Sequence, residues 1–221
     1  MKKAALHNLG CKVNAYETEA MQHLLEEAGY EIVPFTQKAD VYVINTCSVT
    51  NMADRKSRQM LHKAKKNNPD SIVVAAGCYV QTSEKEVLND LSVDIVIGND
   101  RKHDLVRLLE EYSLDSVNDT VDDINDGKHD FEELFIDQTK EHTRAFIKVQ
   151  DGCNQFCSYC IIPYARGRVR SRRFENVIAE VERLAANGFK EVVLTGIHLS
   201  SYGVDFEEAV GLLELIQAVN A

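Results

Sequence analysis

Strand and helix patterns alternate along the first hundred or so residues, and this alternation limits the possible folds more than any other feature of the sequence. A weaker strand pattern at 31–35 contains Pro34, a residue that belongs at a sheet edge. Repeated strand and helix units of this length predict an open parallel sheet with helices on both faces. The stronger strand patterns cover residues 2–9, 41–45, 71–76 and 93–98.

Helix boundaries in this part are marked by capping residues. Asn14 and Glu17 are spaced as a capping box, which predicts that the first helix opens there and closes at Gly29. Further helix patterns occupy 51–66 and 103–112. We therefore assign residues 1–112 to a first domain.

An acidic stretch of low periodicity follows this domain. Residues 113–133 contribute −7 to the formal net charge of −10, so the rest of the chain is only weakly acidic and the charge does not exclude an RNA substrate. We predict an acidic linker or arm over residues 113–142.

A second unit starts at residue 143. A strand at 144–150 leads into a cysteine-rich loop, a helix covers 175–187, a strand covers 191–196, and a helix pattern contains Leu212 and Ile216. This order is typical of the first units of a βα barrel. A complete eightfold barrel needs about 250 residues, so the pattern over 143–221 predicts an incomplete barrel.

Three cysteines, Cys153, Cys157 and Cys160, crowd the loop "DGCNQFCSYC" after that strand. Zinc is one candidate ligand for the C-x3-C-x2-C spacing, but a structural zinc site needs four ligands, and His198 could supply the fourth only through the fold. An iron–sulfur cubane held by three thiolates would leave one iron free to bind a substrate or cosubstrate.

The other cysteines, Cys11, Cys47 and Cys78, each lie just past the carboxyl end of a predicted strand. If the weak strand lies outside the first one, the three strands that carry these cysteines are immediate neighbours, about 4.8 Å apart. The three thiols then converge on one edge of the sheet, close enough to share a metal cluster. Three independently buried cysteines are the simpler alternative.

Composition limits the cellular setting. The sequence shows no signal-peptide core and no run of roughly 20 apolar residues, so we predict a cytoplasmic protein without a membrane partner. In a reducing compartment, six cysteines indicate metal binding, redox chemistry or burial rather than structural disulfides.

The stretch "CNQFCSYC" after a strand resembles the signature of radical S-adenosylmethionine enzymes. The segments "LGCKVNAYETE", "NTCSVTNMADRKSRQ" and "AGCYVQ" resemble the N-terminal domain of the methylthiotransferases of that class. With "LTGIHLSSYG", they are most similar to the branch that methylthiolates N6-threonylcarbamoyladenosine at position 37 of tRNA. The resemblance spans almost the whole chain.

The resemblance implies two 4Fe-4S clusters and S-adenosylmethionine as cofactors. Cys153, Cys157 and Cys160 would hold the catalytic cluster that reductively cleaves S-adenosylmethionine, and the trio Cys11, Cys47 and Cys78 would hold an auxiliary cluster that supplies or carries sulfur. An aromatic C–H bond is not acidic, so a cofactor must bring the reactivity to adenine C2.

Cofactor-binding residues are also implied by the resemblance. Tyr159 matches an aromatic position beside the cofactor adenine, and Thr195 and Gly196 match positions near its methionine part. For Tyr159, a purely packing role remains an equal alternative. The arginines of "ARGRVRSRR" form either a solvated surface or a site that attracts tRNA phosphates or the cofactor carboxylate.

Members of the family continue beyond this length with further barrel strands and a small RNA-binding domain. The resemblance therefore implies a fragment with little activity alone, a tRNA substrate and an electron donor, and it leaves the oligomeric state open. Two alternatives remain: a methylthiotransferase for another tRNA adenosine or a ribosomal protein, and a non-catalytic iron–sulfur or zinc module.

Overall fold

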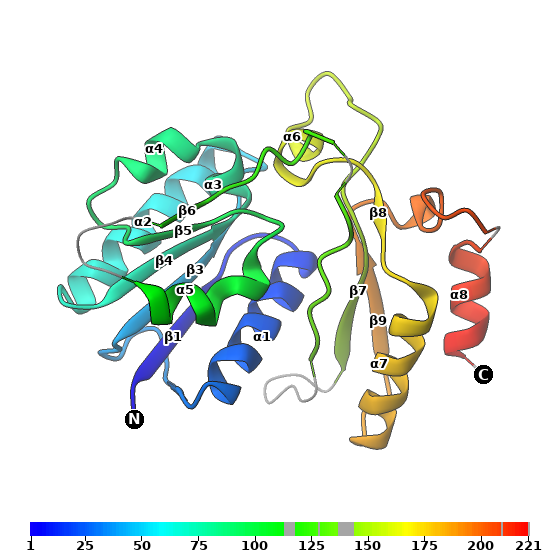
Figure 1. Cartoon of the computed structure of the whole chain (residues 1–221), viewed down its shortest axis with the longest axis horizontal. Coiled ribbons are helices and arrows are strands. Elements are labelled where there is room, and N and C mark those ends of the chain that lie inside the picture. Colours follow the sequence, from blue (N-terminus) through cyan, green and yellow to red (C-terminus); the bar gives the residue numbers. More distant parts are fainter. Residues whose placement is uncertain (113–117, 128, 137–143, 209, 221) are drawn as a thin grey trace.

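Two sheets organise the molecule, which is described from a computed structural model (Figure 1). The structure describes residues 1–112, 118–127, 129–136, 144–208 and 210–220, and of 118–120 only the backbone. Within these ranges, no helix is both long and apolar enough to cross a membrane.

The first sheet is entirely parallel and has the order β2-β1-β3-β4-β5-β6. The short strand that precedes Pro34 lies at the outer edge beside β1, as the proline predicts. The strands are β1 (Lys3–Asn8), β2 (Glu31–Ile32), β3 (Val41–Thr46), β4 (Ile72–Gly77), β5 (Ile95–Ile97) and β6 (Asn118–Thr120).

Helices cover both faces of this sheet, which confirms the predicted open α/β architecture (Figure 1). Met21 and Leu25 of α1 and Leu108 of α5 pack against one face, whereas Leu61 and Ala64 of α2 pack against the other. The helices are α1 (Lys12–Glu27), α2 (Asn51–Asn67), α3 (Cys78–Thr82), α4 (Glu84–Leu88) and α5 (Leu105–Glu111), with a 3-10 turn η1 (Lys102–Asp104).

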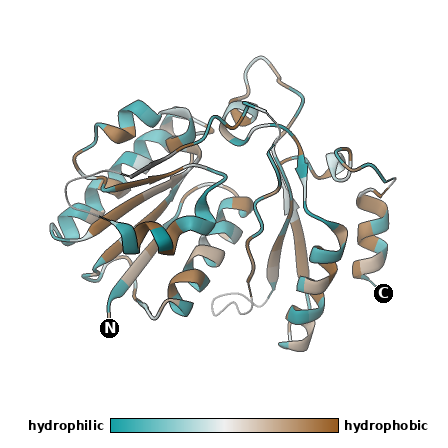
Figure 2. Cartoon of the chain, viewed as in Figure 1, coloured by the Kyte–Doolittle hydropathy of each residue, from teal (hydrophilic) through white to brown (hydrophobic). Residues whose placement is uncertain are grey.

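Burial of the central strands explains their sequence. All six residues of β3 are buried, and the central strands of the first sheet are coloured mainly as hydrophobic in Figure 2. A strand covered on both faces cannot alternate polar and apolar residues, so it reads as a continuous apolar run. Burying each large aliphatic side chain stabilises the fold by about 1.5–3 kcal/mol.

The second sheet has the order β8-β7-β9. Strands β7 and β9 are parallel and joined through a helix, which confirms the predicted opening of a βα barrel, while the short strand β8 runs antiparallel to β7 and was not predicted. Its elements are β7 (Ala145–Asp151), α6 (Ile162–Arg166), β8 (Arg170–Ser171), α7 (Phe174–Ala186), β9 (Val192–Gly196), η2 (Leu199–Ser201) and α8 (Leu212–Val219).

Helix α1 packs between the two sheets. Its Tyr16 and Ala20 form a small apolar cluster with Leu134 and Ile136, residues of the stretch predicted to be a linker. That stretch therefore includes a strand, β6, and a segment buried against α1, although 113–117 and 137–142 lie outside the described residues. The prediction missed this because the acidic residues hide the few apolar ones.

The predicted capping box is wrong. Helix α1 begins at Lys12 with Cys11 at its N-cap, so Asn14 and Glu17 lie inside the helix and are fully buried. Tertiary partners bind both side chains: Asn14 Nδ2 donates to the carbonyl oxygens of Leu9 and Thr46, and Glu17 accepts from basic residues of the second sheet. These partners outweigh the local capping bonds.

Candidate metal centres

The carboxyl ends of three neighbouring strands bring Cys11, Cys47 and Cys78 to one edge of the first sheet. Cys11 follows β1, Cys47 follows β3 and Cys78 is the first residue after β4. Asn8 is in register with Asn45, and Thr46 is in register with Gly77, so these strands end at the same level. Cys11 is exposed, whereas Cys47 and Cys78 are buried.

Glycines make room for these cysteines. Gly10 has φ +108°, and a Cβ at this position would lie 3.0 Å from both Cβ and Sγ of Cys47. The loop that carries Cys11 therefore rests directly against the Cys47 side chain. Gly77, before Cys78, has φ +96°, and a Cβ there would lie 2.4 Å from Oδ1 of Asn45. Only glycine fits both turns.

The Cys78 thiol occupies an unusual electrostatic environment. Burial raises its pKa, which opposes formation of the thiolate, while the positive charges of Arg166 and Lys102 favour it. Asn99 Nδ2 lies 3.7 Å from Cys78 Sγ as a donor. A bound iron would add positive charge beside the sulfur and would favour the thiolate, which burial disfavours.

The second trio lies in the loop between β7 and α6, which projects beyond the sheets in Figure 1. Cys157 is exposed, whereas Cys153 and Cys160 are partly buried. The amide of Cys160 donates to the carbonyl oxygen of Cys157 at 2.9 Å. The loop thus turns back on itself between its second and third cysteines.

Tight backbone packing fixes the start of this loop. Gly152 has φ +70°, and a Cβ there would lie 1.8 Å from the Arg168 carbonyl oxygen. The amide of Cys153 donates to the Gly167 carbonyl oxygen at 3.0 Å. Phe156, itself at φ +45°, has the Arg168 guanidinium 4.3 Å from its ring centroid. These contacts hold the first half of the loop against the segment 167–168.

Among the described residues, no group of three His, Cys, Asp or Glu side chains is placed to hold a single metal ion. The zinc alternative needs four such ligands. His198, its candidate fourth ligand, instead contacts Ser201 through Nδ1 and Ser200 through Nε2. A cubane spreads three thiolates over three separate irons, so its ligands lie farther apart than those of one ion. The donor set, all thiols, suits an iron–sulfur cluster.

The proposed cofactor contacts lie on the same side as the second trio. The side chain of Tyr159 is 91% exposed, so it packs little against the residues that the structure describes. Thr195 is buried at the end of β9, and a Cβ at Gly196 would lie 2.9 Å from Oε1 of Gln150. The structure tests none of the three as cofactor ligands, so these roles stay predictions.

Gln150, which the sequence reasoning missed, joins the ends of β7 and β9. Its Oε1 accepts from the amide of His198 at 2.7 Å, and its Nε2 donates to the carbonyl oxygens of Asp151 and Gly152 at 2.6 and 2.8 Å. One buried side chain thus ties the loop of the second trio to the loop after β9.

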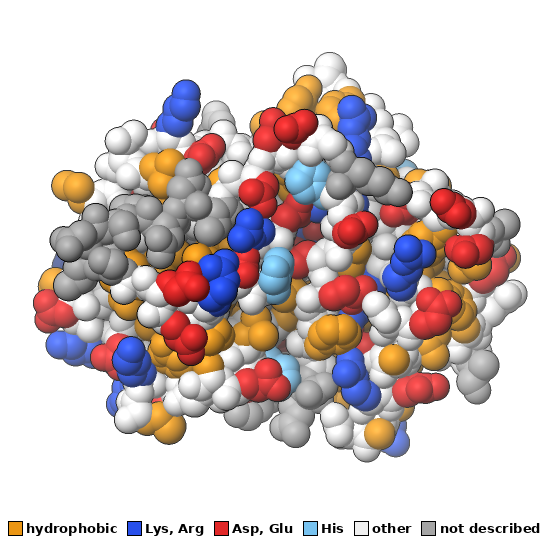
Figure 3. Space-filling model, in the orientation of Figure 1, with side chains coloured by type: hydrophobic (Ala, Val, Ile, Leu, Met, Phe, Trp, Pro, Cys, Tyr) orange, Lys and Arg blue, Asp and Glu red, His pale blue; other side chains and the backbone are white. Residues whose placement is uncertain are grey.

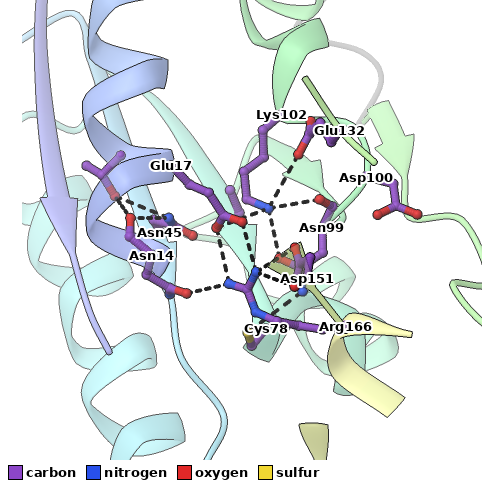
Figure 4. A network of polar contacts seen from close by, with 12 residues as sticks. Asn14, Glu17, Asn45, Cys78, Asn99, Asp100, Lys102, Glu132, Asp151 and Arg166 are labelled. Carbon is purple, nitrogen blue, oxygen red and sulfur yellow. Dashed lines mark hydrogen bonds and ion pairs between the residues drawn. The ribbon is translucent and has the colours of Figure 1, made fainter. Parts of the chain in front are cut away.

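A buried network of charges links the two sheets beside Cys78 (Figure 4). Glu17 of α1 accepts from Lys148 and Arg166 of the second unit, both at 2.8 Å, and Asp151 accepts from the same two residues. Burial alone would raise the pKa of Glu17, but Arg166, Lys102 and Lys148 hold it well below its ordinary value. The sequence does contain an indication of this network: Lys148 and Asp151 lie in a strand pattern, and charged residues are rare in a buried strand.

Both interpretations of the arginine run are wrong for three of its five members. Arg166, Arg170 and Arg172 are buried and pair with Asp151, Asp100 and Glu180, whereas Arg168 and Arg173 are exposed. Each buried arginine thus has an acidic partner, without which burial of its charge would be strongly unfavourable. Acidic and basic side chains are interspersed on the face in Figure 3.

Comparison with known proteins gives a family match for each of the two units. Residues 3–98 match the model of "Uncharacterized protein family UPF0004", and residues 147–218 match that of the "Radical SAM superfamily". The chain is 47% identical over 210 residues to threonylcarbamoyladenosine tRNA methylthiotransferase MtaB of Bacillus subtilis, and 46% identical over 205 residues to its namesake in Aquifex aeolicus. These matches cover 94% and 92% of this chain but 46% and 50% of the relatives.

A solved structure shares the fold. The radical S-adenosylmethionine methyltransferase TsrM from Kitasatospora setae, with cobalamin and a 4Fe-4S cluster bound, is 14% identical and superposes with a TM-score of 0.58. The match covers 90% of this chain and 48% of that one.

These matches define the second unit as a radical S-adenosylmethionine fold joined to a UPF0004 unit. The chain belongs to the radical S-adenosylmethionine methylthiotransferase family, and it spans about half the length of the curated relatives that it matches.

Proposed function

We propose that this chain takes part in the methylthiolation of adenine C2 in N6-threonylcarbamoyladenosine at position 37 of tRNA. The observation that carries the proposal is the pairing of two cysteine trios, one at the ends of β1, β3 and β4 and one in the loop after β7. The branch is supported by identity: relatives named for threonylcarbamoyladenosine reach 47%, and those named tRNA-2-methylthio-N(6)-dimethylallyladenosine synthase 36%.

The two trios have separate roles in this proposal. Cys153, Cys157 and Cys160 hold the cluster that cleaves S-adenosylmethionine, and Cys11, Cys47 and Cys78 hold the auxiliary cluster. When bound, these cofactors supply the radical and sulfur chemistry that protein side chains lack. An electron donor must reduce the clusters, and action on tRNA places the reaction in the cytoplasm.

In this proposal, the protein's own residues hold the cysteine loop in place and orient the bound cofactor. Gly152 and Gln150 fix the loop of the second trio against β8 and β9, so its thiols stand at the open end of the sheet. Exposed Tyr159 stands beside them, free to cover a bound adenine, and Thr195 with Gly196 borders the same end. We also propose the domain division 1–112, 113–142 and 143–221.

Anaerobic reconstitution tests the assignment. Two cubanes require roughly eight irons and eight sulfides per chain, and dithionite-reduced protein should cleave S-adenosylmethionine to 5'-deoxyadenosine and methionine. Incubation with threonylcarbamoylated and with unmodified tRNA, followed by mass spectrometry of the nucleosides, tests the substrate. Zinc without sulfide would instead identify a binding module, and product on another adenosine would change the branch.

A further inference from the structure

The guanidinium of Arg166 in α6 lies at the centre of the buried network and contacts both units of the chain. Its Nη2 donates to Asn14 Oδ1 at 2.5 Å and to Glu17 Oε2 at 3.1 Å. Its Nη1 donates to Glu17 Oε1 at 2.8 Å and to Asp151 Oδ2 at 3.0 Å. The side chain is 1% exposed, so water does not replace these bonds. Two of these contacts, those with Asn14 and Asp151, lead on to residues beside the cysteines.

Asn14 connects Arg166 to the loops of Cys11 and Cys47. Its Nδ2 donates to the carbonyl oxygen of Leu9 at 2.7 Å and to that of Thr46 at 2.9 Å, just ahead of the two cysteines. The Sγ of Cys11 lies 3.9 Å from Asn14 Oδ1, the same atom that accepts from Arg166.

Asn99 makes the corresponding connection to Cys78. Its Nδ2 donates to the carbonyl oxygen of Ala165 at 2.6 Å and lies 3.7 Å from Cys78 Sγ. Lys102 Nζ fixes the Asn99 amide by donating to its Oδ1 at 2.8 Å. The residue before Arg166 is thus tied to the third cysteine of the first trio.

Asp151 extends the network to the second trio. Its Oδ1 accepts from the amide of Gly152 at 2.8 Å and from Arg166 Nη1 at 3.1 Å. Gly152 directly precedes Cys153 and lies close to the Arg168 carbonyl oxygen, which a Cβ at this position would approach to 1.8 Å. From Arg166, the path to Cys153 therefore crosses one carboxylate and one amide.

We propose that Arg166 is a positioning residue that fixes the separation and orientation of the two cysteine trios. A planar guanidinium can hold Asn14, Glu17 and Asp151 at once in set directions, which a single ammonium group cannot do. The inference rests on the proposed function, because it requires a cluster at each trio. Its consequence is a fixed distance from the site of S-adenosylmethionine cleavage to the auxiliary cluster.

The test uses the whole chain with reconstituted clusters. Arg166→Lys keeps the buried positive charge but removes the two planar NH2 groups that bind several acceptors at once. Asn99→Asp keeps the size of the side chain but removes the amide group that donates to Ala165 and lies beside Cys78. Arg107→Lys, at an exposed arginine of α5, is the matched control. The readouts are iron content, circular dichroism and the distance distribution between the reduced clusters from pulsed electron paramagnetic resonance.

We expect wild type and Arg107→Lys to give one narrow distribution at about eight irons per chain, and the two other variants to give a shifted or broadened one at the same iron content. Loss of the auxiliary cluster's iron in either variant would show that the network builds the first trio rather than setting the distance between the two trios, and it would overturn the inference. If Arg166→Lys does not fold, Asn99→Asp decides. Unchanged distributions in folded variants that hold both clusters overturn this inference alone, whereas fewer than two clusters in wild type overturns the proposed function with it.

Discussion

At the scale of single residues, glycines decide whether the cysteines can meet a cofactor. Gly10, Gly77 and Gly152 all have positive φ, and each faces an atom that a side chain would strike. The backbone conformation of the cysteine loops therefore depends on residues that have no side chain. The sequence does not show that these glycines are required, because the atom that a side chain would meet belongs to a residue elsewhere in the chain.

Gly152→Ala is expected to prevent binding of the second cluster and to halve the iron content, from about eight to about four. The added Cβ would lie 1.8 Å from the Arg168 carbonyl oxygen, so the loop must move. Iron analysis after anaerobic reconstitution measures this. Gly188→Ala is the control, since Gly188 has a similar φ of +93° but nothing within 4 Å. Equal iron contents in the two variants would contradict the role of the clash.

At the scale of elements, β8 shows how an arginine run can serve the interior. Arg172 is buried, pairs with Glu180 of α7 and donates to Glu133 at 2.8 Å. Tyr16 of α1 donates to the Leu134 carbonyl oxygen at 2.5 Å in the same cluster. One strand, two helices and the segment before β7 thus share one buried polar group of contacts.

Arg172→Met should destabilise the protein by about 3 kcal/mol, because it leaves the buried Glu180 without its cation. Burial already raises the pKa of Glu180, even with Arg172 beside it. The free energy of unfolding from urea titration gives the comparison. Arg173→Met, at the neighbouring exposed arginine, should change it by less than about 0.5 kcal/mol. A similar loss in both variants would show that burial is not the cause.

The contact between η1 and the segment 129–136 predicts a pH dependence. A hydrogen bond to Glu132 raises the pKa of His103, and the two side chains are 3.2 Å apart. This contribution to stability is complete below the unfolded pKa of about 6.5 and is lost as the pH rises through the higher folded pKa.

The unfolding temperature of wild type should therefore fall, relative to that of His103→Gln, as the pH rises above about 6.5. Differential scanning fluorimetry across this range measures the difference between the two profiles. Glu132→Gln should weaken the same slope, since it removes the negative charge that favours the protonated imidazole. Parallel profiles of wild type and His103→Gln would argue against the contact.

At the scale of the whole molecule, the two trios belong to different sheets, and α1 with the segment 129–136 packs between those sheets. Each trio has its own strand ends and glycine turns, so each site can form without the other. Only their relative placement depends on shared contacts.

Single cysteine variants should consequently lose one cluster each. Cys47→Ala is expected to keep the second cluster and its cleavage of S-adenosylmethionine, whereas Cys157→Ala keeps the auxiliary cluster and loses the cleavage, each at about four irons per chain. Iron analysis and chromatographic detection of 5'-deoxyadenosine separate the two cases. Loss of all iron in either variant would mean that the two sites form together.

Local pattern was enough to predict much of the fold. The continuous apolar runs of β3 and β4, the proline beside β2 and the cysteines after three strands all follow from rules that act within a few residues. The strand order then followed from a common topology of parallel sheets, and the structure agrees with it.

Hydrophobic period and strand ends are local properties, so the amino-acid pattern was enough to place the main strands and helices, although not β6 or β8, and the six thiols beside them. The folded chain was needed to show that Asn14 and Glu17 do not cap α1, that three arginines are buried and that 129–136 packs against α1. Those outcomes depend on partners far along the chain, such as Asn14 and Arg166, which are 152 residues apart. A buried charge is stable only beside its partner, and distance along the chain does not show which partner that is.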